Sequence, residues 1–493
     1  MPTRLESITR FRLEKLQRLR DLGVDPYPRS YKRTHTCRQA IELFEQQEKG
    51  AQTIDDVSLA GRIMSIRKMG KASFVDIRDG SGKIQSYISI QTLGQEKYEL
   101  FKELDIGDIV GIGGKLFRTH SGEITVQGSS ITLLAKAMMP LPEKWHGLVD
   151  TETRYRQRYL DLISNPEIKK NFEIRSNFIS LLRQEMNARG FIEVETPVLQ
   201  SQAGGAAARP FVTHHEALGE DLFLRIATEL HLKRLIIGGF DKVYEIGRVF
   251  RNEGIDIKHN PEFTTMESYE AYADYKDVMV MVEEITSGIV SRIHGSMKIK
   301  WGEEMIDFTP PWKRLYLREA LRERSGIDVL EMNEDQMREK ALELRVDVSA
   351  AKGKGKLIDK LLSTYVEPAL IQPSFLLDYP VEMSPLAKRK SDDPRLVERF
   401  EAFAGGMEIA NAFTELNDPI DQNERFREQA ELRAKGDVEA EVADEDFLTA
   451  LEYGMPPTGG LGLGIDRVAM LITGQSSIRD VVLFPQLKSR EQT

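Results

Sequence analysis

The sequence predicts an α+β protein in which a small β-barrel domain precedes a larger domain of mixed helices and strands. Short β runs broken by glycine fill residues 54–137, whereas helical and strand patterns mix from residue 153 onward. The length of 493 residues also exceeds what one hydrophobic core serves, because chains longer than about 250–300 residues divide into domains. We therefore expect an N-terminal segment at 1–53, a barrel at 54–137, a linker at 138–152 and a second domain at 153–493.

Composition is that expected of a cytoplasmic globular protein. Hydrophobic residues make up 41% and charged residues 30%, and no apolar run reaches the roughly 18 residues that a membrane span needs. The first residues, MPTRLESITRFRLEK, lack the apolar core of a signal peptide. Cys37 is the only cysteine, which argues against a disulfide framework and a cysteine-rich zinc site.

The segment 1–53 is predicted to begin with a basic amphipathic helix. Apolar side chains recur at helical spacing across residues 7–22, and Gly23, Pro26 and Pro28 then end the pattern. Residues 1–40 hold ten Lys or Arg against four Asp or Glu, although the whole chain has a formal net charge of −10. Because salt screens distant charges, a local basic patch can still meet nucleic-acid phosphates. A solvated helix without a partner explains the charges equally well.

The strands expected at 54–137 fit a small barrel. Runs such as ASFVDIRDGSGKIQSYISI and GEITVQGSSITLL read as short strands separated by glycine-containing turns. About five such strands in a segment of this length are typical of an OB-type barrel.

Larger elements follow the Pro-containing connector MMPLPEKWHG (138–147). The tripeptide NPE at 165–167 is a good helix start, and this helix is expected to run to Gly190, ahead of a strand in FIEVETPVL. We predict a mainly helical insertion at about 310–400. The acidic stretch GDVEAEVADED (436–446) is expected to be a solvated connection between helices.

The stretch FRNEGIDIKHNPEFTTMESYEAY changes its rhythm halfway and is predicted to be a substrate-binding hairpin. The strand VYEIGRVFR leads into it, and the chain reverses after Arg251. Side chains two residues apart share a face of a strand, so the returning strand places Phe263, Thr265, Glu267 and Tyr269 together. One side of the hairpin thus offers a guanidinium, an aromatic surface, a carboxylate and a phenol.

A similar face appears in EIANAFTEL. Asn411, Phe413 and Glu415 share one side of this strand, and Glu408 and Ala410 share the other. If the two strands are neighbours, their joint face suits a phosphate, a base and a cation. Each carboxylate taken singly could equally be the partner of a structural arginine.

The third stretch, GGLGLGIDRVAML (459–471), alternates glycines ahead of Arg467 at a helix start. Glycine lets a nucleotide approach the backbone closely. Arg467 can lie flat against an adenine ring while Phe263 covers its other face. A glycine-rich turn alone is a weak signal of a nucleotide site. Its significance depends on the two other stretches described above.

In this order, the three stretches resemble the signature motifs of class II aminoacyl-tRNA synthetases. The long helix with FIEVETP corresponds to the first motif, VFRNEG…HNPEF to the second and GGLGLGIDR to the third. Within the class, the chain is similar to the lysyl-tRNA synthetase family over essentially its whole length, on stretches such as MGKASFVDIRDGSGKIQ, GGAAARPFVTHH and MEIANAFTELNDP. Thr228 and His231 depart from the residues expected at their positions.

The resemblance implies an antiparallel sheet flanked by helices, an OB barrel that binds the tRNA anticodon, and a C2 homodimer formed through the first motif. It implies a lysine–tRNA ligase, which activates L-lysine with ATP and transfers the lysyl group to the 3' end of tRNA(Lys), with Mg²⁺ as cofactor. Such a reaction needs positioning and charge stabilisation more than a general base, since the attacking carboxylate is already ionised.

The resemblance also implies roles for individual residues. Arg251 and Arg467 are expected to be catalytic. The residues expected to bind ATP are Arg251, Glu253, His259, Asn260, Phe263 and Arg467. Those expected to bind lysine are Gly205, Glu229, Arg251, Glu267, Tyr269, Asn411, Phe413 and Glu415, with Gly205 and Glu229 at its α-amino group. Mg²⁺ is expected at Glu401 and Glu408, and the anticodon at Arg67, Phe74, Gln85 and Glu123. Phe74 could instead be a core aromatic of the barrel.

Three other interpretations stay open. An aspartyl or asparaginyl enzyme has similar motifs, but aspartate needs a cation facing its side chain, where this sequence offers carboxylates and a phenol. A lysyl-transfer paralogue that modifies protein or lipid would lack the barrel or add membrane spans. A catalytically silent tRNA-binding module would be free to lose Arg251, Glu408 or Arg467, and all three are present.

Overall fold

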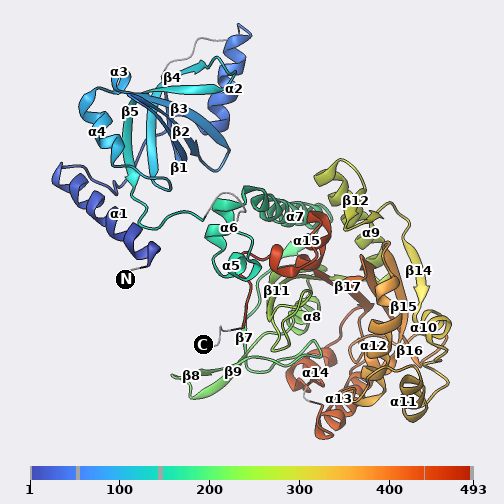
Figure 1. Ribbon diagram of the computed structural model, residues 1–493. Helices are drawn as coiled ribbons and strands as arrows, with labels where there is room; N and C mark the ends of the chain where they lie inside the picture. The colour runs from blue at the N-terminus through green and yellow to red at the C-terminus, as the bar shows by residue number, and fades with distance from the viewer. Residues whose placement is uncertain (1–2, 51–55, 143–147, 438, 489–493) are drawn as a thin grey trace. The chain divides into compact units, whose positions relative to one another are not determined.

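The computed structural model describes residues 3–50, 56–142, 148–437 and 439–488 (Figure 1). The chain divides into two compact units, one ending at Val149 and the other beginning at Asp150. Each unit has a hydrophobic core of its own. Residues 51–55 and 143–147, which fall on the predicted barrel start and linker, lie outside the described residues.

Two helices open the N-terminal unit, α1 (Arg4–Asp21) and α2 (Cys37–Glu48). Each begins with a capping box, formed by Thr3 with Glu6 and by Thr36 with Gln39. The reciprocal hydrogen bonds of a capping box satisfy two backbone donors that a helix start otherwise leaves open. The helix predicted from the apolar spacing at 7–22 therefore begins earlier, at its Thr cap.

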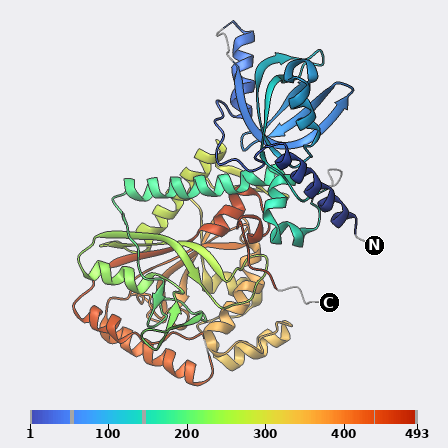
Figure 2. The same ribbon diagram turned by 90° about the vertical axis from the view of Figure 1, so that its left-hand side faces the viewer.

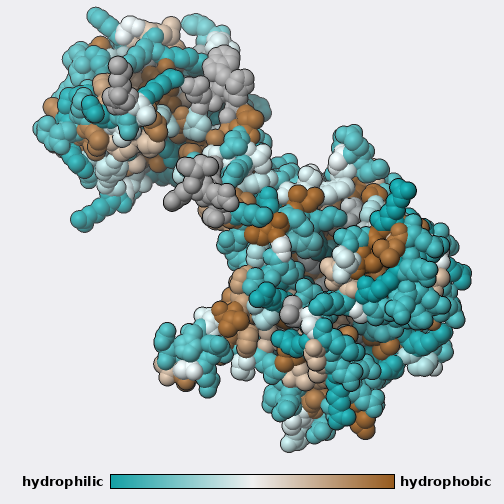
Figure 3. Space-filling view, turned by 60° about the horizontal axis from the view of Figure 1, so that its bottom comes forward, coloured by the Kyte–Doolittle hydropathy of each residue, from teal (hydrophilic) through white to brown (hydrophobic). Residues whose placement is uncertain are grey.

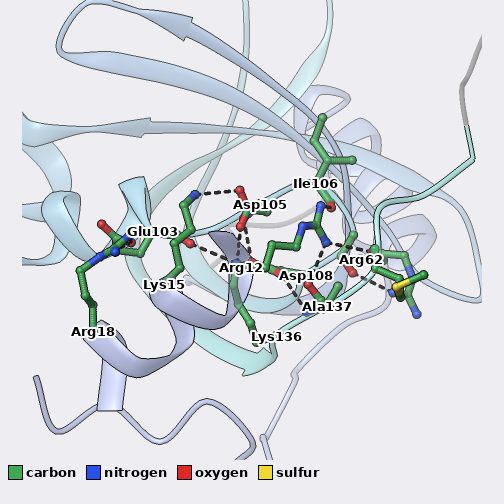
Figure 4. Close-up of polar contacts among 12 residues, drawn as sticks. Arg12, Lys15, Arg18, Arg62, Glu103, Asp105, Ile106, Asp108, Lys136 and Ala137 are labelled. Carbon is green, nitrogen blue, oxygen red and sulfur yellow. Dashed lines mark hydrogen bonds and ion pairs between the residues drawn. The ribbon is translucent and has the colours of Figure 1, made fainter. Parts of the chain in front are cut away.

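Part of the basic face of α1 packs within the N-terminal unit (Figure 4). The Arg12 guanidinium donates to the backbone carbonyls of Ile106 and Ala137, and the Lys15 ammonium lies 2.7 Å from Asp105. Both basic side chains are buried. These two cations hold the helix in place, so only the remaining basic residues of α1 can face a phosphate.

Five strands close into a barrel in the order β1-β2-β3-β5-β4. They are β1 (Val57–Met69), β2 (Ala72–Arg78), β3 (Lys83–Ser89), β4 (Ile109–Arg118) and β5 (Ile124–Ala135), with α3 (Ile90–Leu93) and α4 (Gln95–Lys102) between β3 and β4. Alternate residues such as Val75 and Ile77 fill the interior. The closed barrel confirms this part of the predicted fold class.

A buried lysine fixes the exit from the barrel (Figure 4). The side chain of Lys136 is fully buried, and its ammonium lies 2.5 Å from Asp105 and 2.8 Å from Asp108. It also donates to the backbone carbonyl of Glu103 at 3.1 Å. Both oxygens of Asp108 accept further hydrogen bonds, from the backbone N–H groups of Ala137 and Asp105. Every polar group of this cluster has a partner inside the unit.

The C-terminal unit is built on an eight-stranded sheet with the order β14-β15-β16-β17-β18-β11-β10-β6. The strands are β6 (Ile192–Glu193), β10 (Lys242–Phe250), β11 (Glu262–Ala271), β14 (Lys313–Tyr316), β15 (Ser374–Pro380), β16 (Leu396–Ala404), β17 (Met407–Thr414) and β18 (Thr458–Gly464). Neighbouring strands are antiparallel except at the two edges, where β6 and β14 run parallel to their neighbours. The predicted antiparallel sheet is confirmed, although the strand expected in FIEVETPVL is only two residues long within it.

Three helices cover one face of this sheet: α7 (Lys169–Ala188), α9 (Tyr275–His294) and α15 (Ile465–Thr473) (Figure 2). Met266, Ala412 and Leu461 project from that face into the largest core cluster. Their strand neighbours project from the opposite face, and α8 (Glu229–Ile237) packs there against β10 and β11. The sheet thus has a core face and a second face that carries polar residues.

The remaining elements surround the sheet. α5 (Thr151–Arg156), α6 (Arg158–Ser164) and the 3₁₀ turn η1 (Pro166–Ile168) precede α7. A small sheet joins β7 (Leu199–Gln200), β8 (Val212–His215) and β9 (Glu220–Leu224), and a hairpin joins β12 (Lys298–Trp301) and β13 (Glu304–Asp307). α13 (Pro419–Ala434) and α14 (Glu445–Glu452) lie between β17 and β18 in the sequence.

The helical insertion predicted at about 310–400 is too wide. Its helices are α10 (Leu317–Ser325), α11 (Glu334–Glu343) and α12 (Gly353–Tyr365). The flanking strands β14, β15 and β16 belong to the main sheet. The segment SFLLDYP is buried at every position, so its apolar run carries no alternation that would mark it as a strand.

The acidic stretch 436–446 is not the solvated connection that its composition suggests. Asp437 and Glu441 are buried, and the Lys356 ammonium pairs with Asp437 at 2.6 Å and Glu439 at 2.7 Å. A run of acidic residues suggests an exposed segment. Here a cation distant in sequence pairs with two of the acids and allows part of the run to be buried.

The surface that Figure 3 presents is mainly hydrophilic, with scattered hydrophobic residues. Among the described helices, none is both long and apolar enough to cross a membrane.

Candidate active site

The hairpin predicted from strand alternation forms as expected. β10 and β11 pair antiparallel with Val249 opposite Phe263, Gly247 opposite Thr265 and Glu245 opposite Glu267. β17 carries Asn411 and Phe413, but it is not the neighbour of β11, because β18 lies between them. The two polar faces are therefore joined across a third strand.

That middle strand is the glycine-rich one, and its glycines form the floor between the two polar strands. Gly462 pairs with Glu267 on one side and Asn411 on the other, and Gly460 pairs with Tyr269 and Phe413. A Cβ atom added at Gly460 would lie 1.8 Å from Glu415 Oε1. The alternating glycines thus leave room for side chains of β11 and β17 to meet over β18.

A cavity of about 530 Å³ opens above this floor. It brings together every residue predicted to bind lysine, ATP or a metal. Its lining includes Gly205, Glu229, Arg251, Glu253, His259, Asn260, Phe263, Glu267, Tyr269, Glu401, Glu408, Asn411, Phe413, Glu415 and Arg467. Residues up to 262 positions apart in sequence, Gly205 and Arg467, thus share one site.

One end of the cavity is rich in buried carboxylates. Glu229, Glu267, Glu415 and Glu441 are each at most 8% exposed. The backbone N–H of Thr228 donates to both oxygens of Glu267 at 3.2 Å, and this contact uses only the backbone of Thr228. Four carboxylates concentrated in one enclosed space make this end of the cavity strongly acidic.

A lysine of the protein itself already meets two of these acids. Lys233 Nζ lies 2.5 Å from Glu229 Oε1 and forms an ion pair with Glu415 Oε2. Sequence analysis placed Glu415 among the residues expected to bind lysine and did not foresee a cation of the protein beside it. The prediction is therefore incomplete. Lys233 supplies one cation to this end of the cavity, which holds four carboxylates.

Burial sets the protonation of these groups. It raises the pKa of Glu267 to about 7, with the charge of Glu229 adding to the rise. Burial and the charge of Glu229 raise the pKa of Glu441 to about 8. Burial also raises the pKa of Glu415 well above its usual range, although Lys233 opposes the shift. Because burial disfavours the charged form of these carboxylates, a cation that enters the pocket would stabilise them.

The other end of the cavity carries the arginines and an aromatic ring. The Arg251 guanidinium lies 5.2 Å from the centre of the Phe263 ring. Arg467 donates to Glu408 Oε2 at 2.8 Å and lies 3.3 Å from His259 Nε2. Glu253 lies in the exposed loop between β10 and β11. These groups suit phosphates and a planar base.

Asn260 stands apart from its neighbours in this set. It is buried, its amide donates to the carbonyl of Glu262 at 2.6 Å, and its carbonyl accepts from the N–H of Gln486 at 3.3 Å. Its polar atoms therefore hold the loop and the C-terminal segment together. The expected contact with ATP phosphates would have to replace these bonds, so loop positioning describes its contacts better.

Glu401 and Glu408 come from β16 and β17. Strict alternation places Glu408 on the face opposite Asn411, but the register of this strand pair shifts between Ala402 and Phe403, and Glu408 lines the cavity. A bulge re-aims side chains in this way. The alternation of side chains in the sequence does not predict this bulge.

Each of these carboxylates is paired with an arginine. Arg399 lies 2.5 Å from Glu401, and Arg467 lies 2.8 Å from Glu408. Burial raises the pKa of Glu401 to about 7, with Arg399 opposing and Glu408 adding to the rise. Burial also acts on Glu408, but Arg467 outweighs it and lowers the pKa. Among the described residues, no group of three or more His, Cys, Asp or Glu forms a metal cage.

Two oxygen donors without a full cage still fit one class of ion. Mg²⁺ commonly takes one or two carboxylates and completes its shell with water and phosphate oxygens. Glu401 and Glu408 lie on neighbouring strands and both line the cavity. The residues present therefore fit a Mg²⁺ ion that arrives with a phosphate-bearing ligand.

Sequence analysis missed three residues of this site: Lys233, Arg399 and Glu441. Lys233 lies four residues after Glu229 on α8, a spacing that places both side chains on one helix face. That spacing was the available signal. Arg399 precedes Glu401 by two on a strand and could have been placed on its face.

The residues expected to bind RNA lie on the N-terminal barrel. Arg67, Phe74 and Tyr87 are cross-strand neighbours on β1, β2 and β3, and the Phe74 and Tyr87 rings are 5.2 Å apart. Phe74 is partly exposed and lies outside the core cluster, so it is not a core aromatic. Its neighbours Tyr87 and Phe117 extend the aromatic row and were missed.

The other two anticodon candidates differ in accessibility. Gln85 is buried, and its amide oxygen accepts from Thr125 Oγ1 at 3.0 Å. Glu123 is exposed in the turn before β5. Gln85 thus offers its amide nitrogen more readily than its oxygen.

Comparisons with known proteins agree with this geometry. Residues 150–488 match the family described as tRNA synthetases class II (D, K and N), and residues 57–134 match the OB-fold nucleic acid binding domain. A lysine–tRNA ligase of Dehalococcoides mccartyi is 55% identical over 98% of this chain and 97% of its own length. The chain belongs to the lysine–tRNA ligase family of class II synthetases.

Two further relatives in this family are equally complete. The lysine–tRNA ligases of Pelotomaculum thermopropionicum and Carboxydothermus hydrogenoformans are each 53% identical over 99% of this chain, and the matches cover 96% and 99% of those proteins. The matches to these relatives thus extend over both units of the synthetase.

Proposed function

We propose that this synthetase activates L-lysine with ATP, forming lysyl-adenylate and pyrophosphate, and then transfers the lysyl group to the 3' end of tRNA(Lys). The observation that carries the proposal is the acidic end of the cavity. Four buried carboxylates lie at this end, and the buried ammonium of Lys233 pairs with two of them, Glu229 and Glu415. A substrate that brings two ammonium groups reduces the excess of negative charge there.

The same observation separates lysine from the other two amino acids of the matched family. Aspartate would add a further negative charge among the carboxylates, and asparagine would bring no cation to the carboxylates that face its side chain. Unpaired buried charges cost several kcal/mol, of the order of 2–5 when a pair is broken. Neither amino acid fits the charge of this pocket.

Lysine has an orientation that matches the lining. Its α-ammonium group would meet Glu229 beside Gly205, and its carboxylate would meet Arg251 with Asn411. Its side chain would pass Phe413 and reach Glu415, Glu267 and the Tyr269 hydroxyl. The apolar stem of lysine gains from the aromatic surface, while its ammonium keeps charged partners.

ATP would occupy the arginine-rich end. Phe263 and Arg467 would cover the two faces of adenine, Glu253 would accept from the amino edge of the base, and His259 would face the γ-phosphate. Glu401 and Glu408 would hold a Mg²⁺ ion, which supplies charge neutralisation at the phosphates.

The first step joins the two substrates. An oxygen of the lysine carboxylate attacks the α-phosphorus of ATP, the new acyl–phosphate bond forms, and the bond to pyrophosphate breaks. The attacking oxygen carries no proton, so the chain supplies charge and position through Arg251. In the second step a terminal ribose hydroxyl loses its proton and attacks the acyl carbon, the ester bond forms, and the acyl–phosphate bond breaks so that AMP leaves.

The barrel would bind the anticodon of tRNA. Its support is a partly exposed row of aromatic rings, formed by Phe74 on β2, Tyr87 on β3 and Phe117 on β4. Single-stranded RNA is read by stacking of bases on such rings and by hydrogen bonds to base edges. Arg67, Gln85 and Glu123 would supply the polar contacts.

We also propose a homodimer that works in the cytoplasm, where ATP and tRNA meet. Apolar side chains around the first motif support the dimer: Ile192, Val198 and Leu199 are 53%, 40% and 47% exposed. Such a patch is typical of a surface that a partner covers. Sedimentation velocity would give the mass of one chain if this proposal were wrong.

The decisive experiment is ATP–pyrophosphate exchange measured with each of the twenty amino acids. The proposal expects exchange with lysine well above all others. Exchange that prefers aspartate or asparagine would overturn it, as would the absence of exchange with every amino acid.

A further inference from the structure

Lys233 joins the two carboxylates that the proposed function assigns to opposite ends of lysine. Its side chain is fully buried on α8, one helical turn after Glu229. Its ammonium lies 2.5 Å from Glu229 Oε1 and pairs with Glu415 Oε2. The rings of Phe413 and Phe447 enclose it, with centres 5.4 and 5.9 Å away.

Both carboxylates also face the cavity. Glu415 Oε1 has no hydrogen-bond partner among the described residues, and it lies over the glycine floor, next to the position of a Gly460 Cβ. Glu229 lines the cavity beside Gly205. Each carboxylate therefore keeps one oxygen on Lys233, and Glu415 has its other oxygen free for a ligand.

Lys233 itself stands behind this wall, since it is absent from the described residues that line the cavity. Burial alone would lower the pKa of its ammonium, but the charges of Glu229 and Glu415 outweigh burial and raise it. The group is thus a fixed cation that draws two acids toward one point. Its contacts set how far apart the two acids lie.

We propose that Lys233 is a positioning residue that sets the spacing of Glu229 and Glu415, and thereby makes the pocket select a diamino acid of lysine's length. The inference rests on the proposed function, which places the α-ammonium at Glu229 and the side-chain ammonium at Glu415. Ornithine, one methylene shorter, would then reach only one carboxylate well.

The test compares lysine with ornithine in pyrophosphate exchange. One missing methylene is worth about 10–200-fold in kcat/KM, which gives the wild type a measurable preference for lysine. Lys233→Met removes the charge and keeps an unbranched side chain that is one heavy atom shorter. The two acids then repel each other, and the lysine-to-ornithine ratio of kcat/KM is expected to fall about tenfold or more, with the KM for ATP unchanged.

Lys233→Arg covers the case in which the Met variant does not fold. It keeps the charge, but its wider planar head cannot hold both acids at the original spacing. The ratio is expected to fall while the melting temperature stays near that of the wild type. A merely structural lysine would lower stability and leave the ratio alone.

Lys136→Met is the matched control. Lys136 is also a fully buried lysine between two carboxylates, Asp105 and Asp108, but it lies in the N-terminal unit. Its replacement is expected to lower thermal stability and leave the lysine-to-ornithine ratio at the wild-type value.

The outcomes separate the two proposals. A wild type without lysine-dependent exchange would refute the proposed function itself. A wild type that prefers lysine, with the same ratio in the folded Lys233 variants, would refute only the role of Lys233. A ratio that falls in the Lys233 variants and holds in Lys136→Met supports it.

Discussion

Two buried lysines of this chain have almost the same surroundings and opposite consequences. Lys136 and Lys233 are both fully buried, and each lies between two carboxylates. Around Lys136, both oxygens of Asp108 also accept backbone hydrogen bonds. Around Lys233, Glu415 Oε1 has no hydrogen-bond partner among the described residues. The two clusters therefore differ in whether a carboxylate oxygen remains without a hydrogen-bond donor.

The pKa values of the acids follow this difference. Burial would raise the pKa of Asp105, but hydrogen bonds from Lys136 and Lys15 outweigh it and lower the value. Burial raises the pKa of Glu415, and Lys233 does not offset it. A buried ion pair is thus structural where cations match acids, and part of a binding site where acids are in excess.

The strongest test of this contrast replaces one acid in each cluster. Glu415→Gln keeps the shape of the side chain and removes its charge, so lysine should lose about 2–5 kcal/mol in kcat/KM. The KM for ATP and the affinity for tRNA should barely change, because neither ligand reaches this end of the cavity. Pyrophosphate exchange at varied lysine measures the loss.

Asp108→Asn is its control in the other cluster. This change should lower the melting temperature and leave lysine activation as in the wild type. If Glu415→Gln instead behaves like Asp108→Asn, with a normal KM for lysine in the folded variant, then Glu415 is a structural acid and the contrast fails.

Glu408 is an intermediate case between a paired structural acid and an acid that binds a ligand. It is paired with Arg467 and is also predicted to bind Mg²⁺. Glu408→Gln should lower kcat for activation about 100-fold, near 2.7 kcal/mol, since charge neutralisation matters most in the transition state. Titration of exchange with Mg²⁺ should show a higher requirement for the ion. An unchanged Mg²⁺ dependence would assign Glu408 to Arg467 alone.

Phe74 tests which part of the barrel domain binds RNA. The buried cluster around Lys136 has its charges paired within the unit, so binding is expected at the exposed aromatic rings instead. Phe74→Ala should raise the KM for tRNA by a factor corresponding to about 1–3 kcal/mol, the value of one stacked base. Lysine activation without tRNA should be intact, because the barrel belongs to the other unit. An equal loss in tRNA-independent exchange would point to a folding defect.

The smallest expected effect is a pH dependence of opposite sign in the two clusters. Glu267 and Glu441 have raised pKa values of about 7 and 8, so the stability they contribute is present below their unfolded pKa near 4.5 and is lost as pH rises through 7 to 8. The lowered pKa of Asp105 acts in the other direction: its contribution is lost as pH falls through its folded value.

Lysine should reverse the loss at high pH, because its ammonium groups favour the ionised acids. We expect the KM for lysine to fall between pH 6 and pH 8, by no more than about tenfold per unit for each proton released. Exchange kinetics and melting temperatures with and without lysine measure both effects. A KM for lysine that is flat across this range would contradict the assigned excess of acid.

Local pattern was enough to predict the hairpin and its two faces. The period of two placed Phe263, Thr265, Glu267 and Tyr269 together, and the register of β10 and β11 confirms this. The resemblance to class II synthetases then named the residues that share the cavity. What the pattern could not give was the order of strands, because β18 enters between β11 and β17 from far along the chain.

Two of the missed residues share a physical cause. Lys233 and Glu441 belong to charged types that are mostly exposed, and their burial depends on partners distant in sequence. Glu408 reaches the cavity through a bulge that alternation does not reveal. A sequence shows which groups a chain carries, whereas their pairing is decided by tertiary packing.

The bare backbone at Gly460 also limits how this enzyme could be redesigned. Any coded replacement there places a methyl group or more against Glu415 and Tyr269, 1.8 Å from an oxygen and 2.8 Å from a ring carbon. The pocket cannot be deepened from that side, because hydrogen is already the smallest substituent. Variants that accept bulkier amino acids therefore have to come from changes in the walls, and selection at codon 460 should return glycine alone.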